Sequence, residues 1–251
     1  MSGVVELRAY AELNDFLHPD ARYAAQLRPF RTHQTVKDVV EAAGIPHTEI
    51  DLILVNGESV GFGHHPRSGD RLAAYPMFEK LDIGPLTRVR PSPLRDPRFV
   101  VDVNLGGLAR LMRLMGLDAR SEWDADDAAL AEAAAAEHRI LLTRDRGLLK
   151  RRNVTHGVFV RSDRPFDQIV EVIRGLDLAE RLVPFSRCLR CGGLVTEVAK
   201  QDIVDRLEPL TRRYHDSFRQ CRDCGRIYWK GSHQPRLDDL VARIRTAISP
   251  A

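Results

Sequence analysis

The chain has 251 residues, of which 43% are hydrophobic and 29% charged, a composition ordinary for a folded protein and too apolar for a disordered one. The formal net charge is only +3, but residues 181–251 alone carry 14 Lys and Arg against 8 Asp and Glu. No stretch approaches the roughly 18 apolar residues of a membrane span, and the N-terminus lacks the apolar core of a signal peptide, so we expect a cytoplasmic protein that does not contact membranes.

The first third of the sequence predicts a small domain of mixed strands and one helix. The alternating segment Val4–Tyr10 is typical of a strand, and Thr35–Gly44 predicts a helix with a threonine cap and a terminal glycine. Ile53–Val55 followed by Asn56-Gly57 indicates a hairpin, and Arg71–Tyr75 a closing strand. This order resembles the β-grasp, or ubiquitin-like, fold, and most closely the small sulfur carriers of thiamine and molybdopterin synthesis.

Those sulfur carriers end in a free Gly-Gly tail that becomes thiocarboxylated. Here the chain continues through Phe78–Leu81 without such a tail. We therefore expect a docking or structural module that contacts a protein partner, with a sulfur-transfer accessory as the less favoured alternative.

Two boundaries divide the rest of the chain. Residues 84–97 hold four prolines and three arginines without apolar periodicity, which is typical of a linker. A weaker boundary falls at Leu182–Pro184, just before the first cysteine pair. The predicted segments are a β-grasp domain at 1–83, a linker at 84–98, an α/β domain at 99–183, and a cysteine module with a C-terminal helix at 184–251.

Short apolar runs in the middle segment each lead to an aspartate. These runs and their acids are Arg98–Val101 with Asp102, Arg139–Thr143 with Asp145, and Val158–Ser162 with Asp163. After the first run, apolar residues recur at the spacing of a helix. Asp127 precedes a second stretch that predicts a helix, Ala128–His138. Alternating strands and helices predict a parallel α/β sheet.

Ligands of such sheets bind outside the carboxyl ends of the strands, so we expect Asp102, Asp145 and Asp163 at one edge, with Asp127 reaching it from a helix start. Grouped carboxylates repel one another unless a cation holds them, and oxygen-only ligation favours Mg²⁺ or Mn²⁺. Such an ion activates water and stabilises the charge of a phosphodiester being cleaved. The alternative is that each acid is a helix cap or a turn residue.

The segments Val101–Leu117, Asp127–Leu130 and Ile140–Asp145 resemble the PIN-like ribonuclease domains. They are most similar to the group named after the C-terminal domain of the worm exonuclease Mut-seven, over roughly residues 98–235. Bacterial members of that group carry an N-terminal β-grasp segment. The resemblance implies a metal-dependent ribonuclease in which Asp102, Asp127 and Asp145 bind the catalytic metal and Asp163 assists.

Two features of the acidic site stay open at this point. Asp124 and Asp126 lie close enough to Asp127 for the register of the match to shift. The glutamate that many PIN domains place between the first and third acids has only Glu122 as a neighbouring candidate, so one or two metals are compatible with the sequence.

All four cysteines lie in two CxxC pairs. The pairs are Cys188/Cys191 and Cys221/Cys224, and each is followed by glycine, which permits the turn of a zinc knuckle. We predict a structural Zn²⁺ site of four thiolates. The alternatives are two redox sites or two disulfides, and His215 and His233 are substitute ligands.

Basic and aromatic residues surround the cysteine pairs. We expect Arg190, Arg222 and Lys230, together with Arg144 of the middle segment, to contact RNA, with structured or tRNA-like RNA among the candidate substrates. The aromatics Tyr214, Phe218, Tyr228 and Trp229 are expected mainly in the small core of a zinc ribbon, with base stacking as the alternative. The leading hypothesis is a metal-dependent ribonuclease, and a non-catalytic RNA- or protein-binding adaptor is the alternative.

Overall fold

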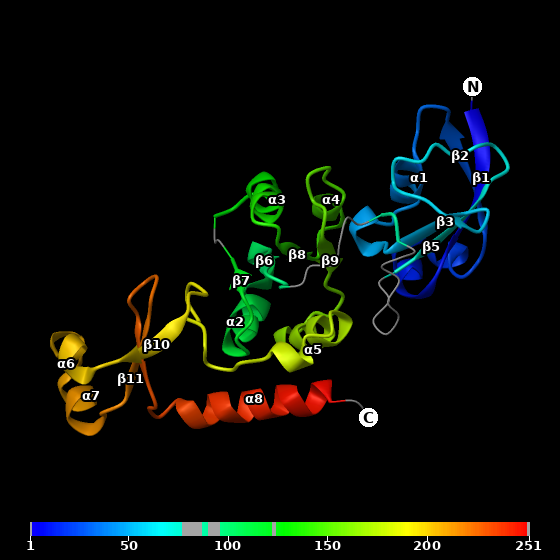
Figure 1. The fold of residues 1–251 in the computed structure, drawn as a ribbon. Helices are drawn as coiled ribbons and strands as arrows, with labels where there is room; N and C mark the ends of the chain where they lie inside the picture. Colours follow the sequence, from blue (N-terminus) through cyan, green and yellow to red (C-terminus); the bar gives the residue numbers. More distant parts are fainter. Residues whose placement is uncertain (1, 77–86, 90–95, 122–123, 250–251) are drawn as a thin grey trace. The chain divides into compact units, whose positions relative to one another are not determined.

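The computed structural model describes residues 2–76, 87–89, 96–121 and 124–249 (Figure 1). The chain divides into two compact units, Met1–Pro97 with Asp127–Phe159, and Arg98–Asp126 with Val160–Ala251. Most of the predicted linker at 84–98, and Glu122, fall outside the described residues. Within the described ranges, no helix combines the length and the apolar character needed to cross a bilayer.

The N-terminal residues form a five-stranded sheet with the order β2-β1-β5-β3-β4. The strands are β1 (Ser2–Ala9), β2 (Gln26–Arg31), β3 (Leu52–Val55), β4 (Glu58–Ser59) and β5 (Arg71–Tyr75). β1 and β5 are parallel, and the remaining pairs are antiparallel. Together with the helix α1 (Val36–Ala42), this arrangement is the predicted β-grasp fold. Short 3₁₀ helices connect the strands at Ala11–Phe16, Pro19–Ala21 and His47–Glu49.

Local signals explain why these elements form. The Thr35 side chain accepts a hydrogen bond from Asp38 N, and the Asp38 carboxylate accepts one from Thr35 N at 2.7 Å, which makes a capping box. The hydrogen bond from Thr35 N also lowers the pKa of Asp38. Asn56 and Gly57 both have positive φ, +51° and +91°, as the two-residue turn between β3 and β4 requires. Val5, Leu7 and Ile53 are fully buried in the core beneath the sheet.

A four-stranded sheet follows, with the order β7-β6-β8-β9. Its strands are β6 (Phe99–Val101), β7 (Ala119–Arg120), β8 (Ile140–Thr143) and β9 (Gly157–Phe159). β6 pairs with β7 in parallel, and so does β8 with β9. The helices are α2 (Gly106–Leu114), α3 (Asp127–Ala136), α4 (Arg146–Leu149) and α5 (Pro165–Gly175), with 3₁₀ turns at Val103–Leu105 and Ala179–Arg181. The predicted parallel α/β architecture is confirmed.

The third apolar run ends earlier than the sequence suggested. β9 stops at Phe159, and after Val160 the backbone amides of Arg161 and Ser162 each donate to the carboxylate of Glu171 at 2.8 Å. Glu171 lies on α5, and its carboxylate accepts the hydrogen bonds that a neighbouring strand would otherwise accept. Asp163 therefore lies in the loop before α5 and not directly at a strand end, which corrects the prediction.

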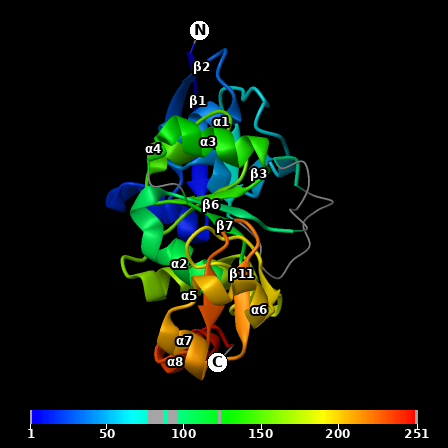
Figure 2. The same ribbon diagram turned by 90° about the vertical axis from the view of Figure 1, so that its left-hand side faces the viewer.

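The cysteine module is a three-stranded antiparallel sheet with the order β10-β11-β12. Its strands are β10 (Val195–Val198), β11 (Phe218–Cys221) and β12 (Ile227–Trp229). Between β10 and β11 the chain forms α6 (Lys200–Ile203), a 3₁₀ turn (Val204–Arg206) and α7 (Pro209–Tyr214), beside one end of this sheet (Figure 1, Figure 2). The final helix, α8 (Gln234–Ile248), contacts α5, where the Arg243 guanidinium lies 5.1 Å from the ring centroid of Phe166.

Candidate functional site

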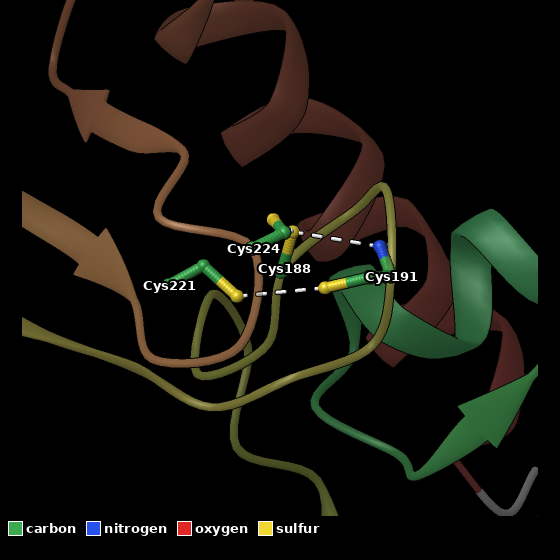
Figure 3. A group of neighbouring side chains, drawn as sticks. All are labelled: Cys188, Cys191, Cys221 and Cys224. Carbon is green, nitrogen blue, oxygen red and sulfur yellow. Dashed lines mark hydrogen bonds between the residues drawn. The ribbon is translucent and has the colours of Figure 1, made fainter.

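The four cysteine sulfurs converge on one point (Figure 3). Among the residues that the structure describes, theirs is the one group of three or more potential metal-ligand atoms from different residues that lie within 4.8 Å of one another. Sγ of Cys188 is 3.6 Å from that of Cys224, and Sγ of Cys191 is 3.5 Å from that of Cys221. Four sulfurs about 2.3 Å from a tetrahedral zinc would be about 3.8 Å apart, so the cluster suits Zn²⁺.

The knuckle geometry follows from the glycines after each pair. Gly192 and Gly225 have φ of +85° and +70°, and their amides donate to the carbonyls of Cys188 and Cys221 at 2.8 and 3.0 Å. All four cysteines are free thiols, which contradicts the alternative of two disulfides. The two histidines proposed as substitute ligands are not part of the sulfur cluster.

Tyr228 supports the cluster from β12. Its Oη lies 3.0 Å from Sγ of Cys188 and accepts a hydrogen bond from the amide of Leu189 at 3.1 Å. Burial raises the pKa of the Cys188 thiol, but hydrogen bonds from Tyr228 and from backbone amides outweigh it and lower the pKa to about 6. Burial beside the other thiols raises the pKa of Cys191 to about 12. Cys191 would therefore need a bound cation to be a thiolate at neutral pH.

The sequence did not single out Arg113, which connects α2 to the first knuckle. Its side chain is only 4% exposed, and its Nη1 donates to the carbonyls of Arg190 at 2.8 Å and Leu189 at 3.4 Å. Nε donates to Ala119 O and Nη2 to Ser121 Oγ, both at 2.7 Å. Burial lowers the pKa of Arg113, while the nearby cysteines act in the opposite direction. A buried guanidinium thus lies against the turn that carries Cys188 and Cys191.

Asp102 and Asp145 each lie in a connection between a strand and the helical turn that follows it. Asp102 directly follows β6, is 5% exposed, and accepts hydrogen bonds through Oδ1 from N and Nδ2 of Asn104 at 3.0 and 3.2 Å. Asp145 lies two residues after β8, is exposed, and accepts through Oδ1 from the amides of Gly147 at 2.6 Å and Leu148 at 3.3 Å. Each acid caps the helical turn that follows it.

Asp127 and Asp163 are both exposed. Asp127 is the first residue of α3, as predicted. Asp163 lies in the loop before α5, where its backbone carbonyl accepts a hydrogen bond from Gln168 Nε2 at 3.3 Å. Asp102 and Asp163 belong to one compact unit, and Asp127 and Asp145 to the other.

The basic residues of the cysteine module separate into two sets. One set donates to backbone carbonyls of the module. Arg187 donates to Gly192 O at 2.9 Å, Arg206 to Gly225 O at 2.6 Å, and Arg219 to Val195 O at 3.0 Å. The residues predicted to contact RNA are exposed: Arg144, Arg190, Arg222 and Lys230. The aromatics divide similarly, because Phe218 and Tyr228 pack in the ribbon whereas Tyr214 is 66% and Trp229 42% exposed.

A family model described as the Mut7-C RNAse domain matches residues 97–241. The chain belongs to this family. A second model, described as Mut7-C ubiquitin, matches residues 2–82, so both predicted resemblances are confirmed. No curated protein matches the chain. Two solved structures of small archaeal modifier protein 1 from Haloferax volcanii are similar to it, each at 20% identity and a TM-score of 0.25. They cover 30% and 32% of this chain, which spans 99% and 100% of theirs.

Proposed function

We propose that this member of the Mut7-C RNAse domain family is a metal-dependent ribonuclease that hydrolyses RNA phosphodiester bonds. The observation that carries the proposal is the match of residues 97–241 to a family described as an RNAse domain. In addition, the two best-matched acids, Asp102 and Asp145, each follow a strand of a parallel sheet, and the carboxyl ends of such strands are where ligands of α/β folds bind.

Asp102, Asp127 and Asp145 would hold the catalytic metal, with Asp163 assisting from its loop. An all-carboxylate donor set fits Mg²⁺ or Mn²⁺ rather than a softer metal. When bound, such an ion supplies the positive charge that activates water and stabilises the leaving oxygen. Hydrogen-bond donors already orient two of these acids, because Asn104 fixes one oxygen of Asp102, and the amides of Gly147 and Leu148 fix one oxygen of Asp145.

The cysteine module would serve the same reaction by binding the RNA strand. Its four thiolates would hold a structural Zn²⁺, because a closed shell of four protein ligands leaves no position for substrate. The exposed cations Arg190, Arg222 and Lys230, with Arg144, would neutralise phosphates. The substrate would then be a cytoplasmic RNA, with structured or tRNA-like RNA among the candidates.

The first experiment is a cleavage assay on a panel of single-stranded and structured RNAs. The zinc-loaded protein is tested with Mg²⁺, with Mn²⁺ or without either, beside the variants Asp102→Asn and Asp145→Asn. Asp202→Asn is a matched control, because Asp202 is an exposed acid of α6 in the cysteine module. We expect cleavage that needs Mg²⁺ or Mn²⁺, is lost in the first two variants and persists in the third.

RNA affinity, measured in parallel, separates the nuclease from the adaptor. Removing a negative charge near phosphate should leave the affinity of Asp145→Asn unchanged or higher. Equal residual cleavage in all four proteins would indicate a contaminating nuclease. A zinc-loaded protein that binds RNA and never cuts any member of the panel would contradict the nuclease and favour the adaptor.

A further inference from the structure

Both ends of the short helix α4 are attached to the ubiquitin-like domain. Arg146, its first residue, donates from Nη1 to the carbonyl of Phe16 and from Nη2 to that of Asp15, both at 3.3 Å. Lys150, its C-cap, donates from Nζ to the carbonyl of Glu41 at 2.9 Å. These contacts all lie within one compact unit of the chain.

The Arg146 guanidinium also lies over two aromatic rings that contact each other. Its carbon is 5.1 Å from the ring centroid of Phe16 and 5.4 Å from that of Phe159, the last residue of β9. The two rings meet edge to face, with centroids 5.4 Å apart. Arg146 is exposed, but two rings and two carbonyls together restrict the conformations that its planar cation can adopt.

Further contacts hold the same face together. The backbone amide of Phe159 donates to Oε1 of Glu49 at 2.5 Å, and Glu49 is mostly buried. His47, also buried, bonds through Nδ1 to the Glu41 carboxylate at 2.6 Å and through Nε2 to the carbonyl of Val154 at 2.9 Å. The ubiquitin-like domain is therefore packed against residues 146–159 and not merely joined to them by a linker.

The position of α4 matters because Asp145 is its N-cap. The helix has four residues, too few to hold a helical conformation without tertiary contacts. The Asp145 carboxylate is oriented by the amides of Gly147 and Leu148, which belong to this helix. Any movement of α4 would move the two donors and the carboxylate together.

We propose that Arg146 is a positioning residue for Asp145, and that the ubiquitin-like domain, by clamping Arg146 with Asp15 and Phe16, is a structural part of the acidic centre. The inference rests on the proposed function, in which Asp145 is a metal ligand. It gives the N-terminal domain a role within the nuclease, separate from recruitment of other proteins.

The test compares Arg146→Gln with Arg152→Gln in the full-length, zinc-loaded protein. The two substitutions remove the same charge from the same segment, and both arginines are exposed, but Arg152 lies outside the clamp. Arg146→Lys serves as the conservative variant that keeps the cation. Three quantities are measured: hydrogen exchange at the amides of Gly147 and Leu148, Mn²⁺ affinity, and the separate values of kcat and KM on an RNA that the wild type cleaves.

For Arg146→Gln we expect faster exchange at both amides and losses of about tenfold in Mn²⁺ affinity and in kcat, with KM nearly unchanged, as for groups that orient metal ligands. Arg146→Lys should recover part of each loss, and Arg152→Gln should match the wild type. The proposal is overturned if Arg146→Gln matches Arg152→Gln in amide exchange and in Mn²⁺ affinity.

The measurements also separate this proposal from the proposed function. Wild-type cleavage that Arg146→Gln retains in full would overturn the positioning role and leave the nuclease intact. A wild type that never cleaves, but whose amide exchange and Mn²⁺ affinity change in Arg146→Gln, would overturn the nuclease and support the clamp. A wild type that neither cleaves nor binds Mn²⁺ would overturn both.

Discussion

Nη1 of Arg113 lies 2.8 Å from the carbonyl oxygen of Arg190, which joins a buried cation of α2 to the turn between Cys188 and Cys191. Arg113 also holds Ala119 and Ser121, at β7 and just after it. The metal knuckle is thus continuous with the α/β fold. Four thiolates around Zn²⁺ carry a net charge of −2, which a neighbouring guanidinium partly offsets.

Replacing Arg113 should destabilise the protein more than replacing an exposed arginine of the same helix. In Arg113→Ala, the carbonyls of Ala119 and Arg190 lose their donor, and we expect the free energy of unfolding to fall by about 3 kcal/mol. Arg110→Ala on an exposed position of the same helix should change it by less than about 0.5 kcal/mol. Urea denaturation of the zinc-loaded proteins measures both, and equal losses in the two variants would contradict this role.

Tyr228→Phe removes the hydroxyl beside Sγ of Cys188 and leaves the ring in place. Because groups that hydrogen-bond to metal ligands tune metal affinity, we expect zinc affinity to fall about tenfold with one zinc still bound per chain. Competition with a chromophoric chelator gives the affinity. Tyr214→Phe is the control, since Tyr214 is exposed on α7, and a loss of the same size there would show that the Tyr228 contact is not responsible.

Gly116 ends α2 in a conformation that only glycine tolerates well. Its φ is +90°, and a Cβ added there would lie 2.1 Å from the carbonyl oxygen of Val183. Gly116→Ala should therefore lower the free energy of unfolding by more than about 2 kcal/mol. Gly175→Ala, where an added Cβ meets nothing within 4 Å, should be neutral or stabilise the protein by about 0.5 kcal/mol. Thermal and urea unfolding of the two variants check the contrast.

The exposed cations of the cysteine module should contribute electrostatically to RNA binding. The triple variant Arg190→Gln, Arg222→Gln and Lys230→Gln removes up to three phosphate contacts, so the slope of log affinity against log salt should flatten by about 2. The control is a triple substitution to Gln of exposed arginines in the ubiquitin-like domain: Arg22, Arg31 and Arg67. Fluorescence anisotropy at several salt concentrations distinguishes them, and identical slopes would locate the RNA elsewhere.

The parts of the fold that could be predicted from sequence are those whose signals are local. Threonine and glycine mark the ends of the α1 segment, Asn56-Gly57 marks a hairpin, and the CxxC spacing marks a metal knuckle. β2 was missed because Pro29 and two arginines interrupt its alternation; Pro29 is tolerated there because β2 is an edge strand.

The parts that could not be predicted depend on partners distant in sequence. Asp163 was placed at a strand end, but Glu171 on α5 bonds the amides of Arg161 and Ser162 and ends the strand pattern early. No local pattern singles out Arg113, because only tertiary packing buries it. The clamp around Arg146 likewise joins residues about 130 positions apart.

The chain between β10 and β11 leaves the ribbon and returns to it at a paired position, Val198 opposite Phe218. Its two ends are thus fixed by strand pairing as well as by the two knuckles. Lengthening a loop whose ends are already held adds only a slowly growing entropic penalty. Apart from Ile203, which is buried, and Arg206, which donates to the carbonyl of Gly225, the residues of this excursion can therefore diverge or accept an insertion while the sulfur cluster keeps its geometry.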